Sequence, residues 1–194
     1  MRAYPLLTAA PLVAALAACA AIGPSTVSSI GPNYDPGEYA RAAQARDIPV
    51  TVRGSAFGVD EAALAKTVAE NMKGHYWAGS ARFTATPGAG SDRMFAFAIA
   101  INAPADATAS ALCKSPTAAS GPAPAAGGPT AGGEVRLLGA LCRFDEAVTT
   151  VVGRVDGATG PQDPKFAALI AAATRDLTPS MMNNGLMDSM DVMD

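Results

Sequence analysis

The sequence predicts an α+β fold, in which a single small domain over residues 38–179 has a mostly antiparallel sheet with two main helices packed on it. Several segments alternate bulky with small or polar residues, most clearly RMFAFAIAINA, and such alternation is typical of strands. Two segments, 60–73 and 164–177, repeat apolar residues at helical spacing. The order of strand, helix, several strands and helix favours helices on one face of an antiparallel sheet.

The first half of the domain is expected to start with a short helix over residues 37–45. The following IPVTVRG alternates β-branched and polar residues and is interpreted as a strand. The helix over 60–73 begins at Asp60, which can cap it, and ends before Gly74. A further strand is expected at ARFTATP.

The segment RMFAFAIAINA is the strongest strand of the sequence. It places large apolar side chains on one face and small ones on the other, with Phe95, Phe97, Ile99 and Ile101 opposite Met94, Ala96, Ala98 and Ala100. The flat alanine face leaves two alternatives open. Either a helix packs closely on it, or it is a lightly covered outer face.

The second half contains a low-complexity loop over residues 115–133 and then two strands, EVRLLGALCRF and AVTTVVGRV. The last helix is capped by Asp163, has Pro164 at its first position and is stopped by Pro179. The methionine-rich tail over 180–194 is expected to be disordered.

The N-terminus has the layout of an export signal. Arg2 precedes an apolar run from Leu6 to Ala18, which is shorter than the about 20 residues needed to span a bilayer. The run ends in LAAC, and this boundary resembles the lipobox of bacterial lipoprotein precursors. The resemblance implies that a signal peptide, 1–18, is cleaved before Cys19 and that lipid, including palmitate, is attached there. An ordinary signal peptide cut nearby and a buried N-terminal helix are the alternatives.

The residues after Cys19 extend these expectations. The segment 19–37 is rich in proline, glycine and serine and is expected to be a flexible tether. By resemblance to enteric lipoproteins, Ala20 in place of aspartate indicates the outer membrane, with the domain facing the periplasm. Three cysteines are an odd number. Lipid on Cys19 would leave Cys113 and Cys142 to form a disulfide that closes the loop, as an oxidising compartment favours.

No catalytic constellation is found in the sequence, and no enzymatic activity and no cofactor are expected. His75 is the single histidine and lacks a positioned nucleophile, while GSAFG has Ala56 where a nucleophile elbow needs serine. The formal net charge of −3 argues against a nucleic-acid partner, because phosphate neutralisation dominates such binding.

Two segments could bind something else. His75, Tyr76 and Trp77 form a candidate binding rim, although the two aromatic residues could simply cover the edge of the core. The tail carries five of the eight methionines, whose thioethers suit Cu(I). It has no accompanying histidine or cysteine, so no metal site is assigned, and a partner-docking or inert tail remains open.

The resulting functional prediction is an envelope lipoprotein with a non-catalytic binding or assembly-assisting role, anchored in the membrane by its lipid. Its partner would be an envelope protein or the cell wall. The alternatives are a periplasmic carrier of a small ligand or copper and a cell-wall-associated enzyme. A deep apolar pocket near Tyr76 and Trp77 would favour the carrier, whereas a shallow exposed patch would favour a protein partner.

Overall fold

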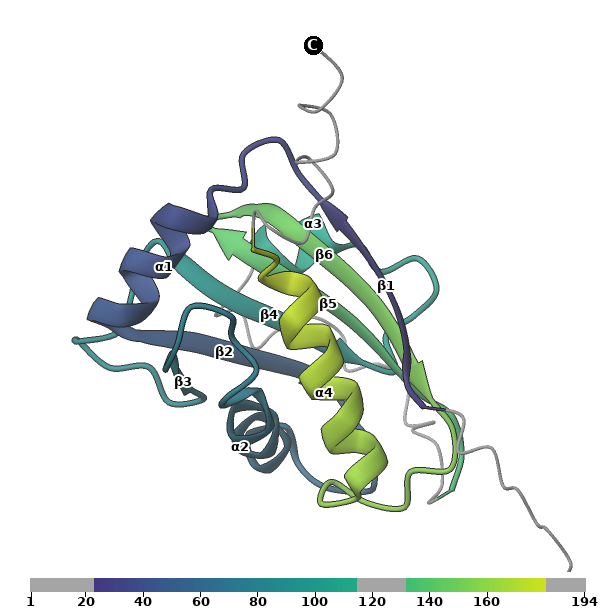
Figure 1. Ribbon diagram of the computed structural model, residues 1–194. Coiled ribbons are helices and arrows are strands. Elements are labelled where there is room, and N and C mark those ends of the chain that lie inside the picture. The colour runs from purple at the N-terminus through teal and green to yellow at the C-terminus, as the bar shows by residue number, and fades with distance from the viewer. Residues whose placement is uncertain (1–22, 115–131, 181–194) are drawn as a thin grey trace, which may run out of the picture.

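The computed structural model describes residues 23–114 and 132–180, which form a mixed sheet with helices on both faces (Figure 1). Helices α1, α2 and α4 cover one face, called here the inner face, and α3 lies on the opposite, outer face. The strands are β1 (Ser25–Ile30), β2 (Asp47–Gly54), β3 (Arg82–Thr84), β4 (Phe95–Ile101), β5 (Val135–Arg143) and β6 (Glu146–Val155). The helices are α1 (Pro36–Ala45), α2 (Glu61–Met72), α3 (Ala109–Lys114) and α4 (Pro164–Leu177). The predicted α+β class is confirmed.

The strand order of the sheet is β1-β6-β5-β4-β2-β3. The first three neighbouring pairs in this order are antiparallel, but β2 is parallel to both β4 and β3. The expected mostly antiparallel sheet therefore becomes parallel at one side. Helix α2 explains part of this difference, because it forms the crossover that parallel strands such as β2 and β3 require.

The two main helices lie where the sequence predicts them, because their ends are determined locally. The Asp60 carboxylate accepts a hydrogen bond from the Ala63 backbone N–H at 2.8 Å, and Asp163 accepts one from Lys165 at 2.8 Å. Pro164 occupies the first turn of α4. The short helix α1 is capped in the same way by Asp35, which accepts from the Gly37 and Glu38 N–H groups.

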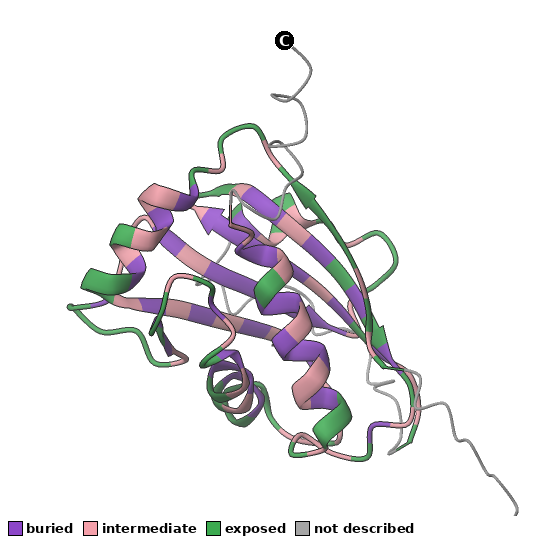
Figure 2. Ribbon diagram, viewed as in Figure 1, coloured by how far each residue is buried: buried purple, intermediate pink, exposed green. Residues whose placement is uncertain are grey.

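The core lies between the inner face of the sheet and the helices (Figure 2). The phenylalanines and isoleucines of β4 point into it, as their alternation predicts. Two glycines, Gly139 and Gly153, allow α4 to approach the sheet closely. A Cβ atom added at Gly153 would lie 2.8 Å from Leu169 Cδ1, and one at Gly139 would lie 3.2 Å from Leu177 Cδ1.

The alanine face of β4 is partly covered by α3, and this resolves the two alternatives in favour of close helix packing over part of the face. Ala98, Cys113, Ala140 and Cys142 form a second buried cluster there. Small side chains let this short helix lie close to the sheet. Helix α3 itself was not predicted, because its six residues are too few to show a helical period.

The segment expected to be a flexible tether contains β1 and the start of α1, so that prediction is wrong from Ser25 onwards. Six residues of β1 pair in register with β6, from Ser25 opposite Arg154 to Ile30 opposite Thr149. The segment is poor in apolar residues, so its order depends on the ladder with β6 and on α4, which packs against it. Such distant contacts leave no local pattern in the sequence.

Other predictions fall outside the described residues. These are the signal peptide 1–18, Cys19, the greater part of the loop 115–133 and the methionine-rich tail beyond Ser180. Within the ranges that are described, no helix is both long and apolar enough to cross a membrane.

Candidate functional site

The predicted binding rim follows the end of α2, where Gly74 takes a positive φ of 78° and turns the chain away from the helix. The structure separates the roles of the next three residues. Tyr76 is buried and its ring lies edge-on to Tyr39, with centroids 5.2 Å apart, so it covers the edge of the core. Trp77 packs against Tyr76 at 5.7 Å but is 47% exposed. Trp77 is therefore the exposed aromatic residue of the rim.

A hollow of about 240 Å³ lies at the rim and is lined by His75, Tyr76, Trp77, Arg175 and Thr178 among others. Small-molecule pockets usually measure roughly 300–1,000 Å³ and are mostly apolar. This hollow is smaller, and charged and hydroxyl side chains line much of it. It matches a shallow exposed patch better than a deep apolar pocket.

His75 lies beside a cation rather than a catalytic partner. Its Nδ1 is 3.3 Å from a guanidinium nitrogen of Arg175 on α4. A general base is normally oriented by a carboxylate or carbonyl and faces a nucleophile. Among residues 23–114 and 132–180, no three histidine, cysteine, aspartate or glutamate side chains are grouped so that they could hold a metal ion.

Behind the rim, three tyrosines are half-buried or buried. The Tyr34 hydroxyl donates to the Pro179 carbonyl at 2.9 Å, whereas the buried hydroxyls of Tyr39 and Tyr76 have no hydrogen-bond partner among the described residues. Burial raises the pKa of Tyr76 to about 12 and raises the pKa of Tyr39 well above its ordinary value. These phenols stay protonated at neutral pH, so they contribute packing and not charge.

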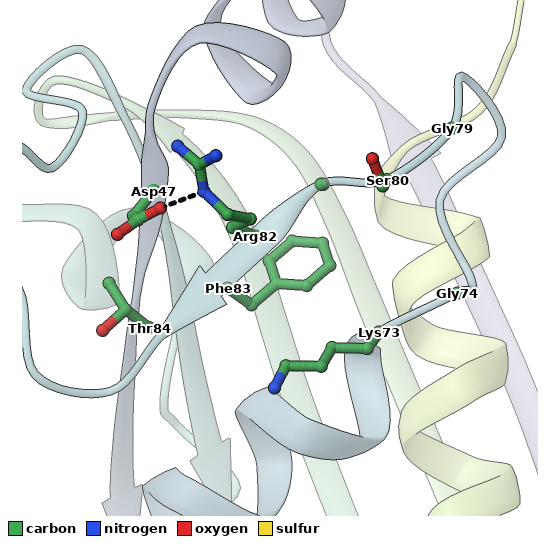
Figure 3. Close-up of a pocket in the computed structure, with 9 residues that line it drawn as sticks. Asp47, Lys73, Gly74, Gly79, Ser80, Arg82, Phe83 and Thr84 are labelled. Carbon is green, nitrogen blue, oxygen red and sulfur yellow. Dashed lines mark hydrogen bonds and ion pairs between the residues drawn. The ribbon is translucent and has the colours of Figure 1, made fainter.

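A larger hollow, of about 650 Å³, lies at the edge of the sheet beside β3 (Figure 3). Its charged side chains already have partners. Arg82 Nε pairs with Asp47, and Lys73 Nζ lies 2.6 Å from Glu70 Oε2. Phe83 lines the hollow and belongs to the core. The hollow therefore offers an arriving ligand an open groove and not a set of converging unpaired groups.

A third feature lies on the outer face of the sheet and was not predicted. Val27, Val152 and Leu138 are opposite one another in register across β1, β6 and β5, and Ser25, Arg154 and Arg136 form the next row. Val27 is 76% exposed and Val152 is 59% exposed. We call this set, Val27, Leu138, Val152, Arg136 and Arg154, the outer-face patch.

A groove of about 510 Å³ lies at the outer-face patch, and both valines and both arginines of the patch line it. Arg154 Nε donates to Ser25 Oγ at 3.2 Å, and Arg136 forms an ion pair with Glu134. The alternation of AVTTVVGRV places Val152 and Arg154 on one face. Val27, the remaining exposed valine of the patch, lies on β1, a strand that the sequence does not predict. The patch could therefore not be predicted from the sequence.

Comparison with known proteins gives little further information. No protein-family model matches the sequence, and no curated protein matches it. Two solved structures of PelC dodecamers from Paraburkholderia phytofirmans, one of them a variant, are similar in fold. Their sequence identities are 10% and 13%, with TM-scores of 0.40 and 0.43, covering 80% and 81% of this chain and 97% and 99% of theirs. At such low values, no statement about this chain rests on the similarity.

Proposed function

We propose that this chain is a lipid-anchored envelope protein with a non-catalytic role, binding or assisting a partner that faces the periplasm. The observation that carries the proposal is the disulfide between Cys113 and Cys142, whose sulfurs are 2.01 Å apart. Disulfides persist in oxidising compartments, so the bond supports export. It also leaves Cys19 as the third cysteine of the chain, at the end of LAAC.

The rim supports a protein partner over a small-molecule cargo. Trp77 is 47% exposed, beside a hollow of about 240 Å³ with a partly polar lining. Exposed aromatic residues of this kind are enriched at protein interfaces. The carrier alternative needs a deep apolar pocket, and neither the rim nor the open groove beside β3 has that form. The proposal includes an outer-membrane location, because the residue after Cys19 is Ala20 and not an aspartate.

The lipid anchor is tested by Cys19→Ser. The variant should move from the membrane fraction to the soluble fraction and lose the acyl mass from its N-terminal peptide. The neighbouring substitution Ala20→Ser is the control, because it leaves the cysteine in place and should keep the protein on membranes. Equal partition of wild type and Cys19→Ser would refute the anchor.

The partner is tested by photo-crosslinking in cells. A photoreactive amino acid at Trp77 should give a discrete protein adduct, identified by mass spectrometry. The same amino acid at Lys66, which is exposed on α2, should give none. If position 77 gives no adduct beyond that background, the rim is not a partner surface.

A further inference from the structure

The outer-face patch combines exposed apolar side chains with positive charge, although the chain as a whole is acidic. Its two valines are among the most exposed large apolar residues of the described chain, at 76% and 59%. Its two arginines lie in the adjacent row, and Glu134 is the one acidic residue among the described residues that line the groove. The formal net charge of the full sequence is −3. The patch therefore places two positive charges beside exposed apolar side chains on a chain whose net charge is negative.

The patch also lies where the chain would leave the membrane. Only five residues lie between Cys19 and Ser25, and the six residue steps of a fully extended chain span at most about 20 Å. Ser25 is fixed in the sheet opposite Arg154 and lines the groove of the patch. A lipid on Cys19 would thus hold this corner of the sheet close to the headgroups.

We infer that the outer-face patch docks the domain onto an anionic membrane surface, with the valines at the headgroup level and Arg136 and Arg154 near lipid phosphates. The inference rests on the proposed lipidation of Cys19. It fixes the orientation of the domain, because the outer face is turned towards the bilayer. The helices α2 and α4, with the rim beyond α2, are on the inner face and are turned towards the periplasm (Figure 1).

The patch does not need a high intrinsic affinity. A short tether turns docking into an intramolecular step with an effective concentration on the order of millimolar. Each arginine near an anionic leaflet increases the binding constant about fivefold. The ion pair with Glu134 reduces the contribution of Arg136. The contact is accordingly expected to orient an anchored domain and not to recruit a free one.

The test places an environment-sensitive fluorophore on the lipidated protein in vesicles of phosphatidylethanolamine and phosphatidylglycerol. One sample carries it on Val152→Cys and the control carries it on Lys66→Cys, on the opposite face. Cys113 and Cys142 are fully buried in their disulfide and do not compete for the label. The emission at position 152 should shift to the blue on reconstitution, while that at position 66 should not.

Charge is tested separately. Arg136→Gln with Arg154→Gln should reverse most of the blue shift, as should high salt or vesicles of phosphatidylcholine alone. The matched control is Arg82→Gln, on β3 at the far edge of the sheet, which should leave the shift unchanged. A blue shift at position 152 that persists in all these conditions would overturn the inference. The inference would also be overturned if the fluorophore at position 152 were as exposed to water as the one at position 66.

Two other outcomes are distinguishable. A blue shift at position 152 that depends on protein concentration and occurs without vesicles would mean that a second copy covers the patch, and membrane docking would be wrong. A protein that carries no acyl mass and does not float with the vesicles would refute the proposed anchor itself. In that case the inference about orientation would be wrong as well. Mass spectrometry separates this outcome from a failure of docking alone, in which the acyl mass is present.

Discussion

Cys113 and Cys142 connect α3 to β5 across the outer face of the sheet, with Cα atoms 5.5 Å apart. The bond lies within a buried cluster of alanines. It therefore does more than close a loop, because it holds a six-residue helix onto a flat surface that offers few large side chains.

Loss of this bond should destabilise the domain strongly. The cysteines are 29 residues apart, and cross-linking a loop of this length contributes about 3–4 kcal/mol through the entropy of the unfolded chain. Cys113→Ala and the double variant with Cys142→Ala should lower the melting temperature by similar amounts. Cys19→Ser should not change it. Equal melting temperatures of the oxidised and reduced wild type would contradict the expectation.

Gly54 should be among the least replaceable residues of the fold. It has a positive φ of 86°, and an added Cβ would lie 2.1 Å from the Ile101 carbonyl oxygen on the neighbouring strand. Gly54→Ala is expected to cost more than about 3 kcal/mol, from strain and from displaced backbone. Gly74 has a φ of 78° with no atom near its Cβ position, so Gly74→Ala should cost only about 1–2 kcal/mol. Urea unfolding of both variants measures the difference, and similar values would show that the contact with Ile101 is unimportant.

The buried hydroxyl of Tyr39 should be dispensable. It has no hydrogen-bond partner among the described residues, so Tyr39→Phe removes an unpaired polar group and should change the free energy of unfolding by less than about 0.5 kcal/mol or increase it. Tyr34→Phe is the matched comparison. It loses the bond to the Pro179 carbonyl and should cost about 1 kcal/mol. A clear loss of stability in Tyr39→Phe would point to a partner, such as a buried water.

The two buried tyrosines Tyr39 and Tyr76 should make the protein lose stability in alkali. Burial raises the pKa of Tyr76 to about 12 in the folded state, whereas the unfolded value is about 10. The neutral phenol is thus fully compatible with folding below pH 10. As the pH rises from 10 towards 12, the unfolded chain ionises first and stability falls. The combined Tyr39→Phe and Tyr76→Phe variant should show a shallower decline between these pH values in chemical denaturation. An identical slope would mean that other groups control the alkaline limb.

The sequence alone could predict those parts of the fold that short segments determine. Asp60 and Asp163 cap helices through neighbours three or fewer residues away, and the alternation around Phe97 is visible within one strand. The parallel pairing of β2 with β4 could not be predicted, because both strands would look the same if they were antiparallel.

The candidate sites show the same limit. The disulfide could be predicted by counting cysteines, but the helix that carries Cys113 could not. Tyr76 and Trp77 are adjacent in sequence, and only the packing of Tyr39 against Tyr76 separates a core residue from an exposed one. Val27 and Val152 are opposite each other on paired strands but lie far apart in the sequence, so no local pattern could place them together.

The position of β1 at the edge of the sheet also determines when the domain can be completed. Ser29 lies beside Thr150, 121 residues later in the chain. During synthesis, the first strand emerges long before its partner, and it must wait until almost the whole domain has appeared. Large sequence separations of this kind slow folding. The last event in assembly is therefore expected at the N-terminal strand, and a chain truncated before β6 would have no strand for β1 to join.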